Sequence, residues 1–111
     1  MKAKYSKIAL QETGGLVLVK ENEIVHAVAA GNYTEVHLSH DRMIRVLRKL
    51  KEVGQLLSED HFVRIHRSHL INLEYAIQFD QTNAKVTLSN GTILPISHNR
   101  RGSFVERFTR I

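Results

Sequence analysis

Short hydrophobic runs separated by turn residues occupy most of this chain. Within several runs, apolar and polar residues alternate with a period of two, which is typical of β-strands with one buried face. The pattern predicts strands over residues 4–10, 16–19, 24–28, 35–38, 63–65, 70–71, 75–79, 85–88 and 92–96. The fold is therefore expected to be mainly β, with roughly eight or more short strands.

One segment changes from this period to a helical one. Its apolar residues recur at spacings of three and four: Met43, Val46, Leu47, Leu50, Val53 and Leu57. This spacing predicts a central amphipathic helix over residues 43–57. The polar face of that helix would carry five basic residues with no acid between them: Arg42, Arg45, Arg48, Lys49 and Lys51. Such a face either contacts phosphates or, as we prefer, is a solvated face whose aliphatic stems cover the core.

The dipeptide Asn90-Gly91 predicts a β-hairpin that joins residues 85–88 to residues 92–96. Both central residues of a type I′ turn need positive φ, and this pair adopts it readily. Pro95, the only proline, lies in the second arm and cannot donate a ladder hydrogen bond. That arm is therefore expected at the edge of a sheet.

The last part of the chain, from Asn99 on, predicts a short basic helix. Four arginines surround three apolar residues there: Arg100, Arg101, Arg107 and Arg110 around Phe104, Val105 and Phe108. The apolar side of this helix is expected to dock on a sheet.

Composition and charge narrow the function. The 111 residues fit one domain, spanning 1–111 with a core over about residues 10–108. Sixteen Lys and Arg against eleven Asp and Glu give a net charge of +5, which favours a polyanionic partner. Cysteine is absent, so no disulfide or thiolate metal site is expected. No apolar run approaches a signal peptide or a membrane span, and we expect a cytoplasmic protein without membrane contact.

One sequence pattern would favour an enzyme. His37-Leu38-Ser39 and His66-Arg67-Ser68 are two His-x-Ser units, the element with which two-histidine phosphoesterases hold and protonate a phosphate. Those enzymes use duplicated lobes, whereas no duplication is visible here. A metal on His66 and His69 is also conceivable, but side chains three positions apart on one strand point to opposite faces. We expect no enzyme, no metal and no cofactor.

Four features together resemble the LytTR DNA-binding domain. They are Gly31-Asn32-Tyr33 between two strands, the amphipathic helix, the run Phe62-Val63-Arg64-Ile65-His66-Arg67-Ser68-His69-Leu70-Ile71-Asn72, and Pro95-Ile96-Ser97 after a hairpin. They occur in the order of that family, and the resemblance extends from about Leu10 to Phe108. The run over residues 62–72 is its most specific part.

The resemblance implies an elongated fold of about ten short strands in three antiparallel sheets, with one central and one short C-terminal helix. It implies sequence-specific binding of double-stranded DNA for transcription regulation, usually as the output domain of a two-component response regulator. Such domains bind direct repeats as pairs of protomers and read successive major grooves through three loops. The receiver domain that normally precedes the module is not in this chain, which is therefore expected to be either a C-terminal fragment or a stand-alone regulator.

By position, the resemblance places the base contacts of the three loops on Asn32, Arg67 and His98. An arginine can donate twice to guanine O6 and N7, and an asparagine can pair with adenine N6 and N7. The histidine can donate to a guanine acceptor. Five neighbours resemble phosphate-contacting residues that set the register: Tyr33, Ser68, Asn99, Arg100 and Arg101.

Several of these residues have a structural alternative. Asn32 could be a turn residue that tolerates positive φ, and Tyr33 could cover the rim of the core. Ser97 or Asn99 could cap the terminal helix. However, positive charge at a helix N-terminus opposes the helix dipole, which indicates that an anion is expected there.

Two residues inside the motif are expected to be structural. His66 is expected to hydrogen-bond the loop backbone, and Asn72 is expected to close a turn.

A third class of function is a basic β-domain whose edge near Pro95 pairs with a strand of an acidic protein. Dependence of binding on salt and on DNA sequence distinguishes this class from DNA recognition.

Overall fold

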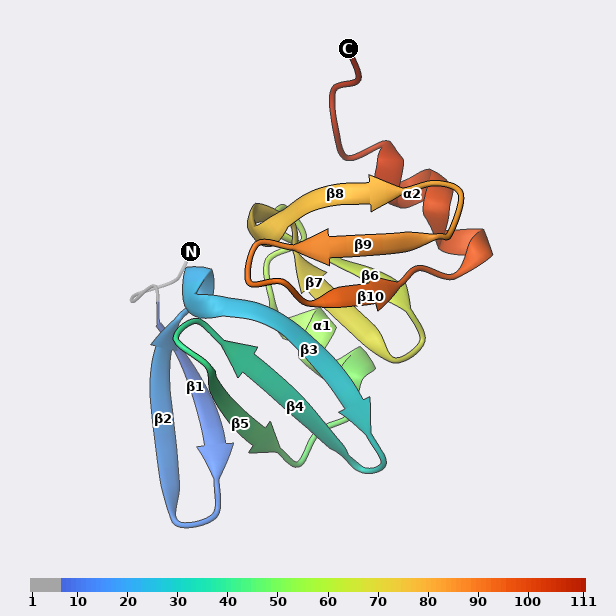
Figure 1. Ribbon diagram of the computed structural model, residues 1–111. Helices are drawn as coiled ribbons and strands as arrows, with labels where there is room; N and C mark the ends of the chain where they lie inside the picture. The colour runs from blue at the N-terminus through green and yellow to red at the C-terminus, as the bar shows by residue number, and fades with distance from the viewer. Residues whose placement is uncertain (1–6) are drawn as a thin grey trace.

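The strands of this protein form three antiparallel sheets (Figure 1). The computed structural model describes residues 7–111. The strands are β1 (Lys7–Glu12), β2 (Gly15–Lys20), β3 (Ile24–Ala30), β4 (Tyr33–Leu38), β5 (Arg42–Val46), β6 (Phe62–His66), β7 (His69–Asn72), β8 (Ala76–Asp80), β9 (Lys85–Leu88) and β10 (Ile93–Pro95). The helices are α1 (Leu50–Leu56) and α2 (Arg101–Val105), with short 3-10 turns at Glu21–Glu23, Leu73–Tyr75 and His98–Arg100. These ten strands and three sheets confirm the predicted fold class.

A five-stranded sheet of order β5-β4-β3-β7-β6 lies at the centre and has a core on each face. The β1–β2 hairpin and α1 cover one face, where buried residues include Leu10, Val36 and Val53. The sheet of order β10-β9-β8, together with α2, covers part of the other face. Buried residues there include Ile71 and Phe104. The apolar residues of the central sheet are therefore divided between two separate hydrophobic cores, one on each face.

The predicted helix over residues 43–57 is wrong in its first half. Residues Arg42–Val46 form β5, in which Ile44 and Val46 are buried and paired with β4, while Met43 and Arg45 are exposed. The helix begins only at Leu50, after the Lys49 main-chain N–H donates to the Glu52 side chain at 3.0 Å. The apolar residues of a strand and of the short helix after it happen to recur at spacings of three and four. The five basic residues therefore share no helix face.

The predicted Asn90-Gly91 hairpin is confirmed, but its turn type is wrong. β9 and β10 pair on either side of it, and β10 with Pro95 lies at the sheet edge as predicted. Only Gly91 has positive φ, at 92°. The two consecutive positive φ values of a type I′ turn occur instead at His40 and Asp41, at 64° and 59°, between β4 and β5.

The two ends of the chain agree with the predictions in part. The predicted strand over 4–10 becomes β1 at Lys7–Glu12, and residues 4–6 lie outside the described residues. The C-terminal helix is present, and Phe104 packs edge-on against Phe79 with ring centroids 5.4 Å apart. In residues 7–111, no helix has the length and apolar character needed to cross a membrane.

Candidate nucleic-acid interface

Three turns lie along one edge of the molecule, at the right in Figure 1. They are the β3–β4 turn, the β6–β7 turn and the segment between β10 and α2. Two main-chain hydrogen bonds tie them together. The Ala29 N–H donates to the Ser68 carbonyl at 3.0 Å, and the Ser97 N–H donates to the Ile65 carbonyl at 2.8 Å. The structure thus brings the three predicted loops to one rim.

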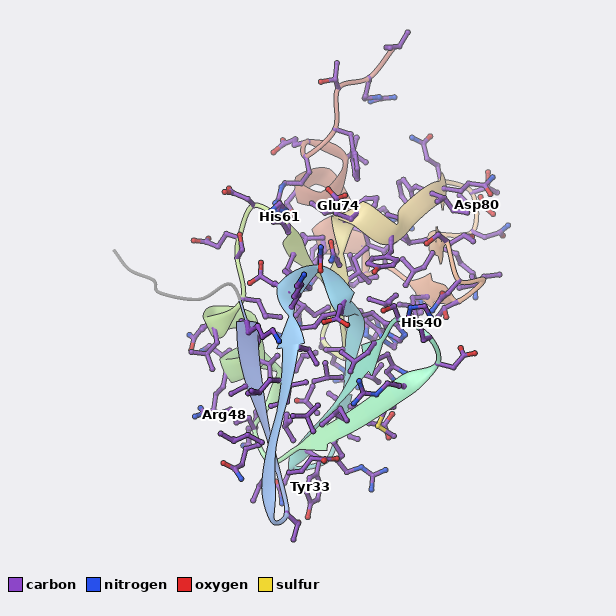
Figure 2. The ribbon with its side chains drawn as sticks, turned by 90° about the vertical axis from the view of Figure 1, so that its left-hand side faces the viewer. Tyr33, His40, Arg48, His61, Glu74 and Asp80 are labelled. Carbon is purple, nitrogen blue, oxygen red and sulfur yellow. The ribbon has the colours of Figure 1, made fainter. Side chains whose placement is uncertain are left out.

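The first turn exposes Asn32 and Tyr33. Gly31 supplies the positive φ, at 65°, so the alternative in which Asn32 takes that conformation is wrong. Tyr33 points away from the core, because the next residue, Thr34, is the buried one. Its ring lies 5.9 Å from the Arg45 guanidinium, and Figure 2 shows it at the opposite end of β4 from His40. Asn32 and Tyr33 are both available to a ligand.

The second turn holds its main chain through other side chains and leaves Arg67 free. Arg64 Nε donates to the His66 carbonyl at 2.9 Å, and Arg64 Nη2 donates to the Arg67 carbonyl. His66 Nδ1 accepts from the Ser68 N–H at 3.1 Å, which confirms its predicted structural role. The exposed Arg67 side chain makes no hydrogen bond or ion pair with the rest of residues 7–111.

The third segment presents His98 and Asn99 to solvent, followed by the half-buried Arg100 and Arg101. The capping alternative is wrong, because neither the 3-10 turn nor α2 has a side-chain cap. Ser97 Oγ instead donates to the Ile65 carbonyl at 3.4 Å. Arg101 Nε is buried without a partner among the described groups. This segment therefore adds free donors and positive charge to the rim.

The charge of the rim is not compensated within the described residues. The only ion pairs found in residues 7–111 join Glu35 to His37 and to Arg45. Burial, followed by the neighbouring Arg100 guanidinium, lowers the pKa of Arg64. Two guanidinium groups thus lie close together with no acid to separate them. A surface of this kind attracts phosphate.

Four histidines form a row on the face of the five-stranded sheet that β1, β2 and α1 leave uncovered. Their strands are neighbours in the order β4-β3-β7-β6: His37, His26, His69 and His66. The His26 and His37 rings stack 4.4 Å apart and 3° from parallel. Burial, then His37 and His69, lower the pKa of His26 to about 4. His26 therefore keeps its neutral form well below the pH at which an ordinary histidine takes up a proton.

The positions of these histidines correct the argument about a metal on His66 and His69, and they weaken the case for a two-histidine phosphoesterase. His66 and His69 do not point to opposite faces but pair across the β6–β7 hairpin, with ring centroids 5.3 Å apart. Even so, the described residues contain no group of three or more ligands fit for a metal. His37 and His66 are three strand spacings apart, about 14 Å. That separation is too large for both histidines to contact one phosphoryl group.

The last motif residue, Asn72, is structural as predicted. It is 1% exposed, its Nδ2 donates to the Ile24 carbonyl at 2.9 Å, and its Oδ1 accepts from the Glu74 N–H at 2.9 Å. It thus closes the turn after β7 and joins that turn to β3. The motif run over residues 62–72 combines framework residues with one free arginine.

Adjoining turns that carry arginines without an ion-pair partner in residues 7–111 are typical of the class of nucleic-acid-binding domains. The family model of the LytTr DNA-binding domain matches residues 14–109, and the chain belongs to this family. It is therefore a DNA-binding domain of the kind used in transcription regulation.

Similar proteins agree with this assignment. The chain is 27% identical over 104 residues to the heme-containing CO-sensing transcriptional regulator RcoM 1 of Paraburkholderia xenovorans, covering 90% of this chain and 39% of that protein. It is 29% identical over 73 residues to the sensory transduction protein LytT of Oceanobacillus iheyensis, covering 66% of this chain and 30% of that protein. The chain thus spans about two fifths or less of the length of these relatives.

A solved structure shows the same fold. It is a LytTr DNA-binding domain of a methyl-accepting/DNA response regulator from Bacillus cereus, with a TM-score of 0.79 and 23% identity. The match covers 94% of this chain and 97% of that one.

Proposed function

We propose that this domain recognises operator DNA through Asn32, Arg67 and His98, each reading base edges in a major groove. The single observation that carries the proposal is the rim, where three turns are joined by main-chain hydrogen bonds and the Arg67 side chain has no partner in residues 7–111. An unpaired guanidinium can donate twice to guanine, the commonest specific contact in the major groove.

The molecule is large enough to extend along one turn of B-DNA, since its longest extent is 44 Å and one turn rises roughly 34 Å. Five neighbours of the reading residues would contact phosphates and set the register: Tyr33, Ser68, Asn99, Arg100 and Arg101. Three of them lie on the turns of the rim, while Tyr33 and Arg101 are the first residues of β4 and α2, which follow two of these turns.

We further infer that the domain, a single unit over residues 1–111, is the output part of a two-component response regulator in bacterial cytoplasm. Its named relatives include a sensory transduction protein and a gas-sensing transcriptional regulator, both longer than this chain. The domain would bind direct repeats, with one protomer on each repeat. Weak binding by one protomer would then be raised by occupation of the neighbouring site.

The test of this proposal begins with selection of bound duplexes from a random pool. A repeated motif is the expected result. On the selected duplex, Arg67→Ala should weaken binding by about 1–3 kcal/mol and relax the preference at one base position. The matched control is Arg42→Ala, another exposed arginine, which follows the β4–β5 turn at the opposite end of β4 from Asn32. Equal losses for Arg67→Ala on selected and random duplexes would remove Arg67 from base readout.

The phosphate contacts have a different signature. Arg100→Ala and Arg101→Ala should each weaken binding to all duplexes alike and reduce the slope of log affinity against log salt by about one. A protein-binding β-domain would show neither a preferred duplex nor this slope.

A further inference from the structure

We propose that Arg64 is a positioning residue for DNA recognition: it fixes the main chain of the β6–β7 turn from behind, so that Arg67 is presented to a base. The inference rests on the proposed reading role of Arg67. Arg64 itself would contact no base.

The contacts of Arg64 point to this role. Its guanidinium reaches forward along the chain and donates to two successive carbonyls, those of His66 and Arg67, which form the turn itself. The side chain is half-buried rather than extended into solvent. Two of its five N–H donors are therefore engaged by main-chain oxygens of the turn.

A β-bulge makes this arrangement possible. Arg64 pairs with Leu70 and His66 pairs with His69, so Ile65 has no cross-strand partner in the register. Bulges bend a strand and redirect its side chains. The Ile65 carbonyl accepts instead from the Ser97 N–H, which joins the third rim segment to the same point.

The rest of the turn is fixed as well. The Ser68 N–H donates to His66 Nδ1, and the Ser68 carbonyl accepts from the Ala29 N–H. With the main chain held at both ends, the side-chain torsions of Arg67 are the main freedom that remains. Fixing a turn before binding lowers the entropy lost when the complex forms. Without Arg64, the His66 and Arg67 carbonyls would lose their donor and the turn would open.

Arginine is required for this role because its planar fork can donate to two carbonyls at once. A lysine ammonium is a compact point charge on a flexible stem and cannot reproduce that geometry. By contrast, a lysine does serve as a phosphate contact. Arg64→Lys therefore separates a positioning role from a direct electrostatic one.

The DNA experiment compares Arg64→Gln, Arg64→Lys, Arg67→Ala and the double variant Arg64→Gln/Arg67→Ala on selected and scrambled duplexes. Both Arg64 variants should reduce the preference for the selected duplex by about tenfold, with less than about threefold change on the scrambled one. The double variant should show the same preference as Arg67→Ala alone, because positioning acts only through Arg67. A uniform loss on both duplexes that lysine restores, or losses that add in the double variant, would overturn the proposal.

A second measurement needs no DNA. Amide hydrogen exchange at Ser68 and Ala29 in the free protein should be faster in Arg64→Gln and Arg64→Lys, with Arg42→Gln as the control for lost charge. Urea denaturation of each variant separates this local opening from a change in global stability. Unchanged exchange at both amides would overturn the proposal. If Arg67→Ala left DNA preference intact, the proposed function would fail, while the exchange data would still decide whether Arg64 holds the turn.

Discussion

Acid should destabilise this fold through His26. The side chain is only 5% exposed, it stacks on His37, and its Nδ1 has no partner among the described residues. Burial, with contributions from His37 and His69, lowers its pKa from the ordinary 6.5 to about 4. A proton on this ring would be buried beside other histidines with no acceptor for it.

The sign and size of the effect follow from linkage. The unfolded chain takes up a proton on His26 as pH falls below 6.5, whereas the folded chain takes it up only near pH 4. The contribution to stability is therefore fully present above pH 6.5, declines between pH 6.5 and 4, and declines no further below that. A difference of 2.5 pKa units (6.5 minus 4) corresponds to about 3 kcal/mol. The lowered pKa of His69, caused by burial and by His66, acts in the same direction.

Urea denaturation between pH 7.5 and 4 measures this effect. The comparison is between the unaltered chain and His26→Phe, which keeps an aromatic ring on His37 but cannot titrate. Over this range the variant should lose about 3 kcal/mol less stability than the unaltered chain. His61→Gln, at an exposed histidine, is the control and should follow the unaltered chain. Parallel pH curves for the unaltered chain and His26→Phe would refute the assignment, whatever their absolute difference at pH 7.5.

Three further substitutions test the framework. Asn72→Ala should lower the free energy of unfolding by about 1–3 kcal/mol, because the buried Ile24 carbonyl loses its donor and the Glu74 N–H loses its acceptor; urea denaturation should show no such loss for the exposed Asn83→Ala. Phe104→Ala should lower it by about 3–5 kcal/mol and should weaken thermal stability accordingly, since the ring is 2% exposed in the second core. Gly91→Ala should lower it by about 1 kcal/mol or more through its φ of 92° alone, because nothing lies within 4 Å of an added Cβ; an equally stable variant in calorimetry would contradict this.

Much of the fold could be predicted because each strand carries its own local signal. The alternation of buried and exposed residues in β4, and the apolar run in β2, identify strands without knowledge of their partners. The turn at Gly91 and the edge position of Pro95 are likewise local consequences of backbone chemistry. The three rim loops were found only because the resemblance to the LytTR family gave their positions.

The errors arose where a local signal was ambiguous or where the signal was not local. Residues 43–57 join an amphipathic strand to a short helix, and their apolar positions fit one long helix equally well. The histidine row could not be predicted, because His37, His26 and His69 become neighbours only through the strand order β4-β3-β7. The sequence also gives no sign of the bulge at Ile65, on which the contacts of Arg64 depend.

The run over residues 62–72 combines residues that hold the fold with a residue that is free to contact a ligand. Phe62 and Ile65 enter the two cores, Arg64 and His66 hold the turn, and only Arg67 is exposed. Because the turn is fixed without the Arg67 side chain, the residue that would read DNA can change without loss of framework contacts. Phe62, Arg64, Ile65 and His66 cannot, since each bonds the main chain of the turn or fills a core. This division explains why such a run identifies the fold firmly, while the one residue of the run that we propose to read DNA, Arg67, is left free to vary.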